Sequence, residues 1–495
     1  MVAISMYLFA ASVALIAVYL KYLYRRRRRD EPPMVPGGLI WGNCKEFGEH
    51  AVKFLHKSHK SCGDIFTIRL LHQYLTIVMD PHSYDRFTRE KNFDFDPIQK
   101  QVNHNVFSFE LINPRKMLKE AGKTVRGHYM NNILQNFSKY LNETFADIST
   151  KDILGNLHEI PKGEKWCTSN LRVLTARTMF TSLFKTIFGN PRPEDTFEPM
   201  SVFENFEIYH KYFNYMWLGL PSSLFPAATK ALKTLVKQPC SSDLLSREDL
   251  SHYIRFSTEY MLNYNQAEAE IMGHNLVYLH VNYNTFRVSF WTMYFLLEHR
   301  EAWMALSTEV QAAIEEKKQY CSDDEPIVFN LEDVESLPIL DSIVKETMRT
   351  TSGVFMVRAI ADDTEFEMEN GQKYYLRKGD KVAMYPPALH KDPEIFEEPE
   401  QFKYDRFVDA KFYKNGREVK NPVIAFGSLC PGKRLAITQS KWFLMCLVNM
   451  FDLELLEGQS TCPDSAYHGH EILPPKNDVE VRFRHKDSFQ TLSFE

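Results

Sequence analysis

Apolar residues recur at helical spacing through most of the chain between residues 120 and 320. The stretch 271–303 stands out because it is apolar on nearly all sides and has neither proline nor glycine after Gly273. This pattern predicts a long buried helix that crosses a domain, with a membrane-spanning helix as the alternative. Three ionisable side chains inside the stretch argue against a membrane span: His274, His280 and Arg287.

Short runs with strand character flank this helical middle. Residues 64–81 contain two β-rich runs, with His72 and Gln73 expected at the turn between them, and strand-like pieces return at 354–360 and 366–386. The whole pattern predicts a mainly α, α+β fold, in which a helix-rich domain carries a small β-rich region.

A further helix is predicted at 331–350, where apolar residues keep helical spacing despite Pro338. Glu346 and Arg349 are three positions apart near its end, so they would share one helix face. The following stretch, 386–407, is rich in proline and acidic residues and is predicted to be irregular.

The start of the chain has a pattern of its own. Val2–Leu20 carry no charge, and the arginines Arg25–Arg29 follow shortly afterwards. Positive charge on this side of an apolar run keeps the following chain in the cytosol. We therefore predict a transmembrane signal anchor at 1–24, a basic and proline-containing hinge at 25–38 and a cytosolic domain at 39–495. A cleavable signal peptide is the alternative.

Composition narrows the function classes. The chain has 495 residues and a net charge of -5, and no basic stripe runs through its body, which argues against a nucleic-acid binder. The 8 cysteines form no C-x-x-C pair, so neither a zinc knuckle nor a disulfide framework is indicated, and a reducing compartment fits best.

Residues 425–434, AFGSLCPGKR, place Cys430 just before an apolar, helix-like run. A helix dipole and free backbone N–H groups would stabilise a thiolate there, and Pro431 and Gly432 allow the turn that frees those groups. Such a thiolate suits a nucleophile, a redox thiol or a metal ligand, although the loop offers neither a base nor a second thiol. A buried inert cysteine is the alternative.

Several other motifs, which occur in a fixed order, favour a functional thiolate at Cys430 over a buried inert cysteine. After the arginine-flanked anchor come "NT" at 284–285, "ETMR" at 346–349, "FKYDRF" at 402–407 and "CPGKRLA" at 430–436. In this order the chain resembles the cytochrome P450 family of haem-thiolate monooxygenases, over almost its whole length. Stretches such as "EGQSTCP" and "ILPPKNDVE" look like the sterol-hydroxylating branch, most of all its cholesterol 7α-hydroxylases.

The resemblance implies a haem b cofactor. Cys430 would be the proximal thiolate on the haem iron, where thiolate ligation favours O–O cleavage. Phe426 and Gly432 would belong to the same haem-binding loop. Arg358 would pair a haem propionate, because a guanidinium matches a carboxylate with two hydrogen bonds.

Two further groups of residues receive roles from the resemblance. Glu346, Arg349 and Arg406 would form a buried ion network behind the haem, which holds geometry rather than reacting. Asn284 and Thr285 would lie over the distal face, where many monooxygenases have an acid before the threonine. An asparagine cannot supply a proton by ionising, but it can orient water.

The substrate and the electron donor are implied in the same way. Lys433 and Arg434 would face an acidic NADPH-dependent reductase, which supplies electrons for the reaction with O2. The enzyme would be anchored in the endoplasmic reticulum membrane with its catalytic domain in the cytosol. The apolar candidates for a sterol pocket are Tyr278, Phe286, Val354, Phe355 and Met356.

The expected reaction is hydroxylation of cholesterol or an oxysterol, at the 7α position. Hydroxylation at the 12α position and isomerisation of an endoperoxide, as in prostacyclin synthase, are the enzymatic alternatives.

The chain departs from the family pattern at Phe426, which is only four residues before Cys430, so the loop is three residues short. The long helix is also one residue short before "NT". These departures leave a haem-poor protein that binds sterol or a partner as a third possibility.

Overall fold

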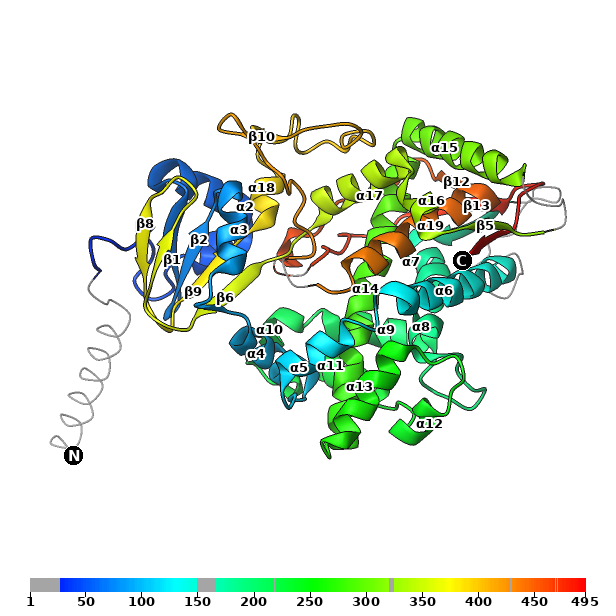
Figure 1. The fold of residues 1–495 in the computed structure, drawn as a ribbon, viewed down its shortest axis with the longest axis horizontal. Coiled ribbons are helices and arrows are strands. Elements are labelled where there is room, and N and C mark those ends of the chain that lie inside the picture. Colours follow the sequence, from blue (N-terminus) through cyan, green and yellow to red (C-terminus); the bar gives the residue numbers. More distant parts are fainter. Residues whose placement is uncertain are drawn as a thin grey trace. The chain divides into compact units, whose positions relative to one another are not determined.

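The computed structural model describes residues 27–148, 166–217, 219–319, 325–427, 430–467, 469 and 471–495. These residues form two units (Figure 1). The β-rich unit contains the described residues up to Ile98 together with Phe355–Phe396 and Tyr413–Pro422, and the helical unit contains the others. Helix α4, Asp96–Phe107, runs from the first unit into the second.

The β-rich unit is built on a sheet with the strand order β1-β2-β9-β6-β3. Its strands are β1 Ile65–Leu70, β2 Gln73–Val78, β3 Phe93–Asp94, β6 Met356–Ile360 and β9 Lys381–Met384, with smaller ribbons of β7 Thr364–Glu367, β8 Lys373–Leu376, β10 Tyr413–Lys414 and β11 Arg417–Glu418. Strands β1 and β2 pair antiparallel, whereas β9 lies parallel to β2.

The hairpin predicted at 64–81 is confirmed, but its turn lies one residue earlier than expected. Leu70 pairs with Gln73, so Leu71 and His72 make the turn. Leu71 has a φ of 55°, a left-handed conformation that is unusual for a branched side chain. No residue pattern predicts this conformation, because glycine or asparagine is the usual signal for such a turn.

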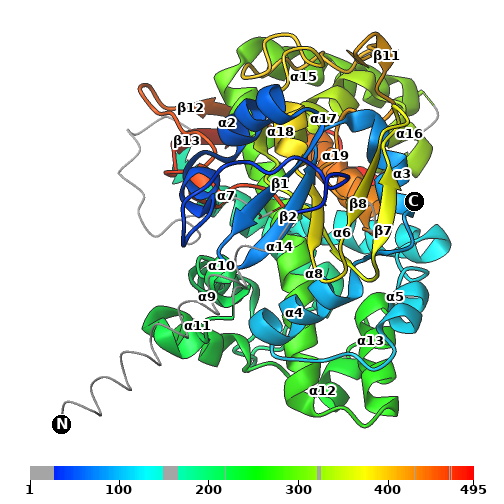
Figure 2. The ribbon, with the colours of Figure 1, turned by 90° about the vertical axis from the view of Figure 1, so that its left-hand side faces the viewer.

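Helices cover this sheet. They are α2 Cys44–Cys62, α3 Tyr84–Arg89 and α18 Pro386–His390. Helices α2 and α18 lie side by side (Figure 2). Their buried residues Ala51, Leu55 and Ala388 share one apolar cluster with the sheet residues Phe66 and Ile77. This shared core explains why strands far apart in the sequence belong to one unit.

The helical unit contains the long helix that the sequence predicts. Helix α14, Glu268–Glu298, is buried along most of its length. It ends earlier than the predicted residue 303, because His299 leaves the helical conformation and α15, Arg300–Lys318, begins directly after it. Gly273 packs closely, because a Cβ added there would clash with the carbonyl oxygen of Phe107.

Within the part of the chain that the structure describes, we find no helix with the length and apolarity needed to cross a membrane. The predicted anchor at 1–24 and the first residues of the hinge at 25–38 lie outside the described residues. Those predictions therefore remain untested.

The helix predicted at 331–350 is divided into two. Helix α16, Leu331–Glu335, is followed by α17, Pro338–Thr351, in which Pro338 occupies the first turn. Proline suits this position because the N–H that it lacks would have no partner within the helix. The carboxylate of Glu309 on α15 accepts the next N–H groups, those of Ile339 and Leu340, each at 2.8 Å.

The other helices of this unit are α5 Pro114–Ala121, α6 Gly127–Asp147, α7 Leu171–Thr175, α8 Thr181–Phe188, α9 Pro199–His210, α10 Phe213–Trp217, α11 Pro226–Leu235, α12 Ser241–Leu245, α13 His252–Asn263 and α19 Lys433–Met450. Its strands are β4 Cys167–Asn170, β5 Ile327–Phe329, β12 Phe451–Leu455, β13 Glu480–His485 and β14 Leu492–Phe494. The predicted α+β composition, a helix-rich body with a small β-rich region, is confirmed.

Candidate functional site

Cys430 lies just before α19, as the sequence predicts. It is a free cysteine whose residue surface is exposed. Protein atoms on its other sides desolvate the thiol and raise its pKa, and the negative charge of Glu471 raises it further, while the N–H of Gly432 and the charge of Lys433 act in the opposite direction. Gly432 is the residue that precedes the first helical turn. The thiol therefore has one backbone donor, and the charges of Lys433 and Glu471 act on its pKa in opposite directions.

The two basic residues after the loop have different surroundings. Lys433 is exposed. Arg434 binds Glu335 of α16 with two hydrogen bonds, from Nε and Nη2, each at 2.6 Å. The charge of Arg434, which is expected to face a reductase, is thus paired with the carboxylate of Glu335 in the same chain.

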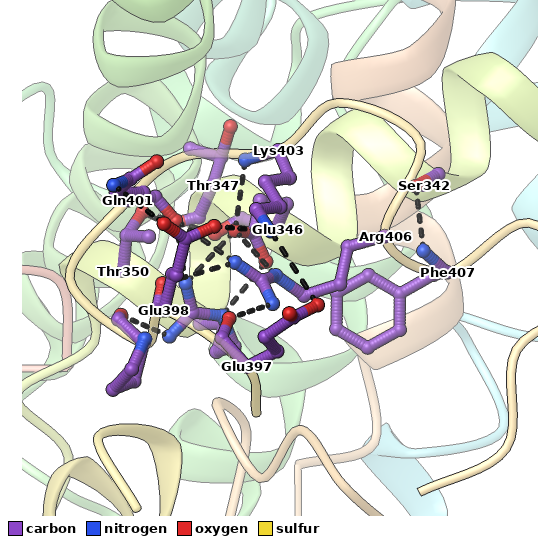
Figure 3. A network of polar contacts seen from close by, with 12 residues as sticks. Ser342, Glu346, Thr347, Thr350, Glu397, Glu398, Gln401, Lys403, Arg406 and Phe407 are labelled. Carbon is purple, nitrogen blue, oxygen red and sulfur yellow. Dashed lines mark hydrogen bonds and ion pairs between the residues drawn. The ribbon is translucent and has the colours of Figure 1, made fainter. Parts of the chain in front are cut away.

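The predicted ion network is assembled around one carboxylate (Figure 3). Glu346 is fully buried, and its Oε2 accepts from Nε of Arg349 at 2.7 Å. Its Oε1 accepts from Nη2 of Arg349 at 2.8 Å and from Nε of Arg406 at 2.9 Å. The backbone N–H of Lys403 donates to the same oxygen at 3.1 Å.

Further guanidinium hydrogens of this network donate to backbone carbonyls. Arg349 donates to the carbonyls of Pro399 and Gln401, and Arg406 donates to those of Glu397, Glu398 and Gln401. These groups belong to an irregular segment without helix or strand. The two arginines therefore fasten this segment to α17.

Asn284 and Thr285 lie on α14. The amide nitrogen Nδ2 of Asn284 donates to the carbonyl of His280 at 3.2 Å and to the carboxylate of Glu471 at 3.4 Å. Thr285 is buried, and its carbonyl accepts from the hydroxyl of Ser289. The carboxylate of Glu471, which lies outside α14, thus contacts Asn284. Many monooxygenases of the family have an acidic residue at the position of Asn284.

Sequence reasoning missed Glu471 and the histidines near it. His280 served only as an argument against a membrane span, and His210 and Glu471 belong to none of the quoted motifs. Isolated polar residues on different elements have no spacing that would reveal a contact. A buried histidine in an apolar helix is the one available signal.

The pocket candidates belong to both units. In the helical unit, the ring of Tyr278 packs against Tyr253, and that of Phe286 packs against Phe203. Val354 is buried in the same unit. The sequence prediction that these residues line a sterol pocket stays a prediction.

The other candidates lie in the β-rich unit. Phe355 packs against Tyr385, and Met356 is buried at the start of β6. Arg358 follows on the same strand and lies over the ring of Phe95. Burial lowers the pKa of Arg358, and the nearby Tyr84 and Asp94 raise it. Its role toward a propionate also stays a prediction.

The comparisons with known proteins agree with the order of these motifs. A family model described as Cytochrome P450 matches residues 32–245 and 284–481. The chain belongs to the cytochrome P450 family. The first matched segment lies before the "NT" motif, and the second contains this motif and the Cys loop.

Several curated relatives of this P450 chain are sterol hydroxylases. "Cytochrome P450 7A1" of Oryctolagus cuniculus is 29% identical over 487 residues, which are 93% of this chain and 95% of that protein. "Cholesterol 7-alpha-monooxygenase" of Cricetulus griseus is 28% identical, with 98% of this chain and 100% of that protein covered. "7-alpha-hydroxycholest-4-en-3-one 12-alpha-hydroxylase" of Homo sapiens is 27% identical, with 95% and 97% covered. The predicted family and its sterol-hydroxylating branch are confirmed.

The residues around Cys430 fit the haem that the P450 family implies. The sulfur is free, the N–H of Gly432 is directed at it, and no described residue beyond Pro431 and Lys433 has an atom within 4 Å of a Cβ added at Gly432. Cys430 would hold the iron as a thiolate, and Gly432 would stabilise the charge on the sulfur. The half-buried Phe426 packs against the main apolar core. Ser428 and Leu429, which complete the short loop, lie outside the described residues.

Proposed function

We propose that this P450 chain is a haem-thiolate monooxygenase that hydroxylates a sterol. The observation that carries the proposal is the similarity over nearly the whole chain to enzymes whose names state hydroxylation of cholesterol or a related sterol. Among the positions of the sterol, we propose 7α, since a cholesterol 7-alpha-monooxygenase matches 98% of this chain and 100% of its own length, whereas a 12-alpha-hydroxylase of equal identity matches 94% and 95%. The substrate would be cholesterol or an oxysterol.

The wider setting follows from the same proposal. Residues 1–24 would anchor the protein in the endoplasmic reticulum membrane, with residues 39–495 as the cytosolic catalytic domain. An NADPH-dependent reductase would deliver electrons, and Lys433 is an exposed positive charge that suits an acidic partner. A bound haem would supply the chemistry that inserts one atom of O2. Cys430 would hold this haem, while Glu346, Arg349 and Arg406 keep the segment before the Cys loop in place.

The first prediction concerns Cys430. The full-length protein, reduced with dithionite under carbon monoxide, should show the red-shifted Soret band that gives the family its name, because the thiolate is the iron ligand. Cys430→Ala should abolish the band. Cys240→Ala should keep it, since Cys240 is also a free, exposed cysteine but lies in none of the family motifs.

Other spectra would contradict the proposal in distinct ways. A band typical of thiol- or histidine-ligated haem would mean that the short loop does not hold the thiolate. A protein without haem would leave only a sterol- or partner-binding role. With haem bound, turnover of cholesterol should require the reductase and NADPH. Turnover of an endoperoxide without NADPH would favour the isomerase alternative.

A further inference from the structure

A chain of polar side chains connects α9 to Asn284 on α14. Nε2 of His210 and Nδ1 of His280 are 3.1 Å apart, and Nε2 of His280 is 3.1 Å from Oε1 of Glu471. Nη2 of Arg287 lies 3.5 Å from Nδ1 of His210. Both histidines are buried, and the ring of Phe213 stacks on His280 at 5.3 Å. The histidine pair is thus shielded by protein on its faces.

The direction of each hydrogen bond follows from the chemistry of its ends. Arg287 can only donate and the Glu471 carboxylate can only accept. A neutral His210 therefore accepts at Nδ1 and donates from Nε2, and a neutral His280 does the same. With these tautomers, each contact from Arg287 through His210 and His280 to Glu471 has one donor and one acceptor.

Backbone contacts fix the place of Glu471. Its carbonyl accepts from the N–H of Gly353 at 3.0 Å. The next carbonyl, that of Ile472, accepts from Nη1 of Arg287 at 2.9 Å, and the carbonyl of Leu473 accepts from the indole of Trp291 at 2.7 Å. Residues of α14 therefore hold this segment against the helix that carries Asn284.

The amide of Asn284 has one permitted orientation in this setting. Both groups near Nδ2, the His280 carbonyl and the Glu471 carboxylate, are acceptors, so the nitrogen has to face them. The other amide atom, Oδ1, is buried, and within the described part of the chain no group donates a hydrogen bond to it. A buried acceptor without a donor is costly, which indicates a donor that is not among the described residues.

We propose that Glu471 and His280 are positioning residues that orient the amide of Asn284, so that Oδ1 accepts a hydrogen bond from an O–H group at the reaction site. The inference rests on the proposed function. The O–H group belongs either to the sterol or to the water that delivers protons. Glu471 thereby acts on the position next to Thr285 without being adjacent to it in the sequence.

One test reads the positioning without haem. In the full-length protein, NMR of ¹⁵N-labelled histidines should show His280 and His210 protonated at Nε2. The side-chain NH2 signal of Asn284, assigned by its absence in Asn284→Ala, should exchange slowly with water. Glu471→Ala should give a mixture of tautomers at His280 and faster exchange at Asn284, because both donors lose their acceptor. Protonation of His280 at Nδ1 in the wild type would overturn the proposal.

A second test identifies the source of the O–H group in the haem-loaded enzyme. Glu471→Gln keeps an acceptor for His280 but presents an NH2 group to Asn284, which should turn the amide and remove the free acceptor. If the sterol hydroxyl is the donor, KM should rise about tenfold at unchanged kcat, and an analogue without this hydroxyl should show no change. If water is the donor, KM should stay constant and more of the NADPH should be consumed without product.

Glu457→Gln is the matched control, because Glu457 is an exposed glutamate in the same C-terminal region. It should leave the NMR signals and the kinetics unchanged. Variants of Glu471 that alter neither KM nor the yield of product per NADPH would overturn the proposal. A protein that takes up no haem would contradict the proposed function alone, and the NMR measurement would then decide the positioning of Asn284.

Discussion

The Glu346 cluster shows what a guanidinium does that another cation cannot. Arg349 is fully buried, and it donates to both oxygens of Glu346 as well as to two backbone carbonyls. A buried charge is tolerated when every donor has an acceptor. The planar fork of arginine meets this demand in fixed directions, whereas the ammonium of lysine has fewer donors on a flexible stem.

We therefore expect Arg349→Lys to lower the free energy of unfolding by about 2–3 kcal/mol, because lysine keeps the charge but leaves buried acceptors without a hydrogen bond. Urea denaturation of the full-length protein would measure it. Arg482→Lys is the matched control: Arg482 also binds a carboxylate, that of Glu454, but at an exposed site, where the loss should be about 1 kcal/mol or less. Equal losses of unfolding free energy in the two variants would contradict the conclusion that the buried guanidinium of Arg349 stabilises the fold more than an exposed one.

The sequence predicted only part of this cluster. Helical spacing places Glu346 and Arg349 on one face, and the structure confirms that they form a pair. Arg406 joined them only through the resemblance to a family, because 60 residues of sequence separation carry no periodic signal. The carbonyls between 397 and 401 were not predictable, since any residue type supplies a carbonyl and only the path of the backbone aims it.

At the scale of elements, α17 is held at its start and along one side. Glu309 caps its first N–H groups, and Asp341 connects it to α19 through Lys441, with Oδ1 and Nζ 2.7 Å apart. Lys441 is buried. The same carboxylate also binds Lys345. Asp341 is therefore the anion that allows a cation to be buried between two helices.

This pair gives stability a defined dependence on pH. Burial raises the pKa of Asp341, but hydrogen bonds from Lys345 and Lys441 outweigh it, and the pKa lies below its ordinary value. A depressed pKa means that the carboxylate stabilises the fold above the unfolded pKa of about 3.9. This stabilisation is lost as the pH falls through the folded pKa.

Asp341→Asn should thus lower the free energy of unfolding by about 1–3 kcal/mol at neutral pH. The difference from wild type should be constant down to about pH 5 and should shrink below about pH 4. Urea denaturation at a series of pH values would show this. Asp405→Asn, at an exposed aspartate, should cause little change at any pH. A difference that persists at acidic pH would contradict the role of the charge.

Sequence patterns also predicted elements better than their boundaries. Residues 331–350 read as one helix because the apolar spacing continues across Pro338, yet Pro338 begins a second helix. The cap that makes this start favourable comes from Glu309 on another helix, so no local pattern could reveal it. Residues 271–303 likewise read as one helix, yet α14 ends at Glu298 and α15 begins at Arg300.

At the scale of the whole molecule, the β-rich unit is assembled from separate parts of the chain. Strand β9 pairs with β2, and β6 pairs with both β9 and β3. The sequence predicted the later strands as strands. It could not predict their partners, because the central pairing is parallel and non-local, and no turn between the partners sets its register.

A peptide of residues 27–98 should accordingly fail to fold by itself. It contains β1, β2 and β3, but β3 pairs only with β6 among the described residues. Far-UV circular dichroism should show no cooperative thermal transition, and addition of a peptide of residues 355–396 should restore one. A peptide with the same composition in scrambled order is the control. A cooperative transition of 27–98 alone would contradict the prediction.

The split of this unit also affects how the protein is made. A ribosome releases β2 long before β9, and at roughly 5–20 residues per second about 300 further residues take on the order of 15–60 s to follow. During that time the edge of β2 that β9 will occupy is open to other extended chains. Newly made protein should therefore depend on chaperones that bind nascent chains, and synonymous codons that slow synthesis between the two strands should increase aggregation.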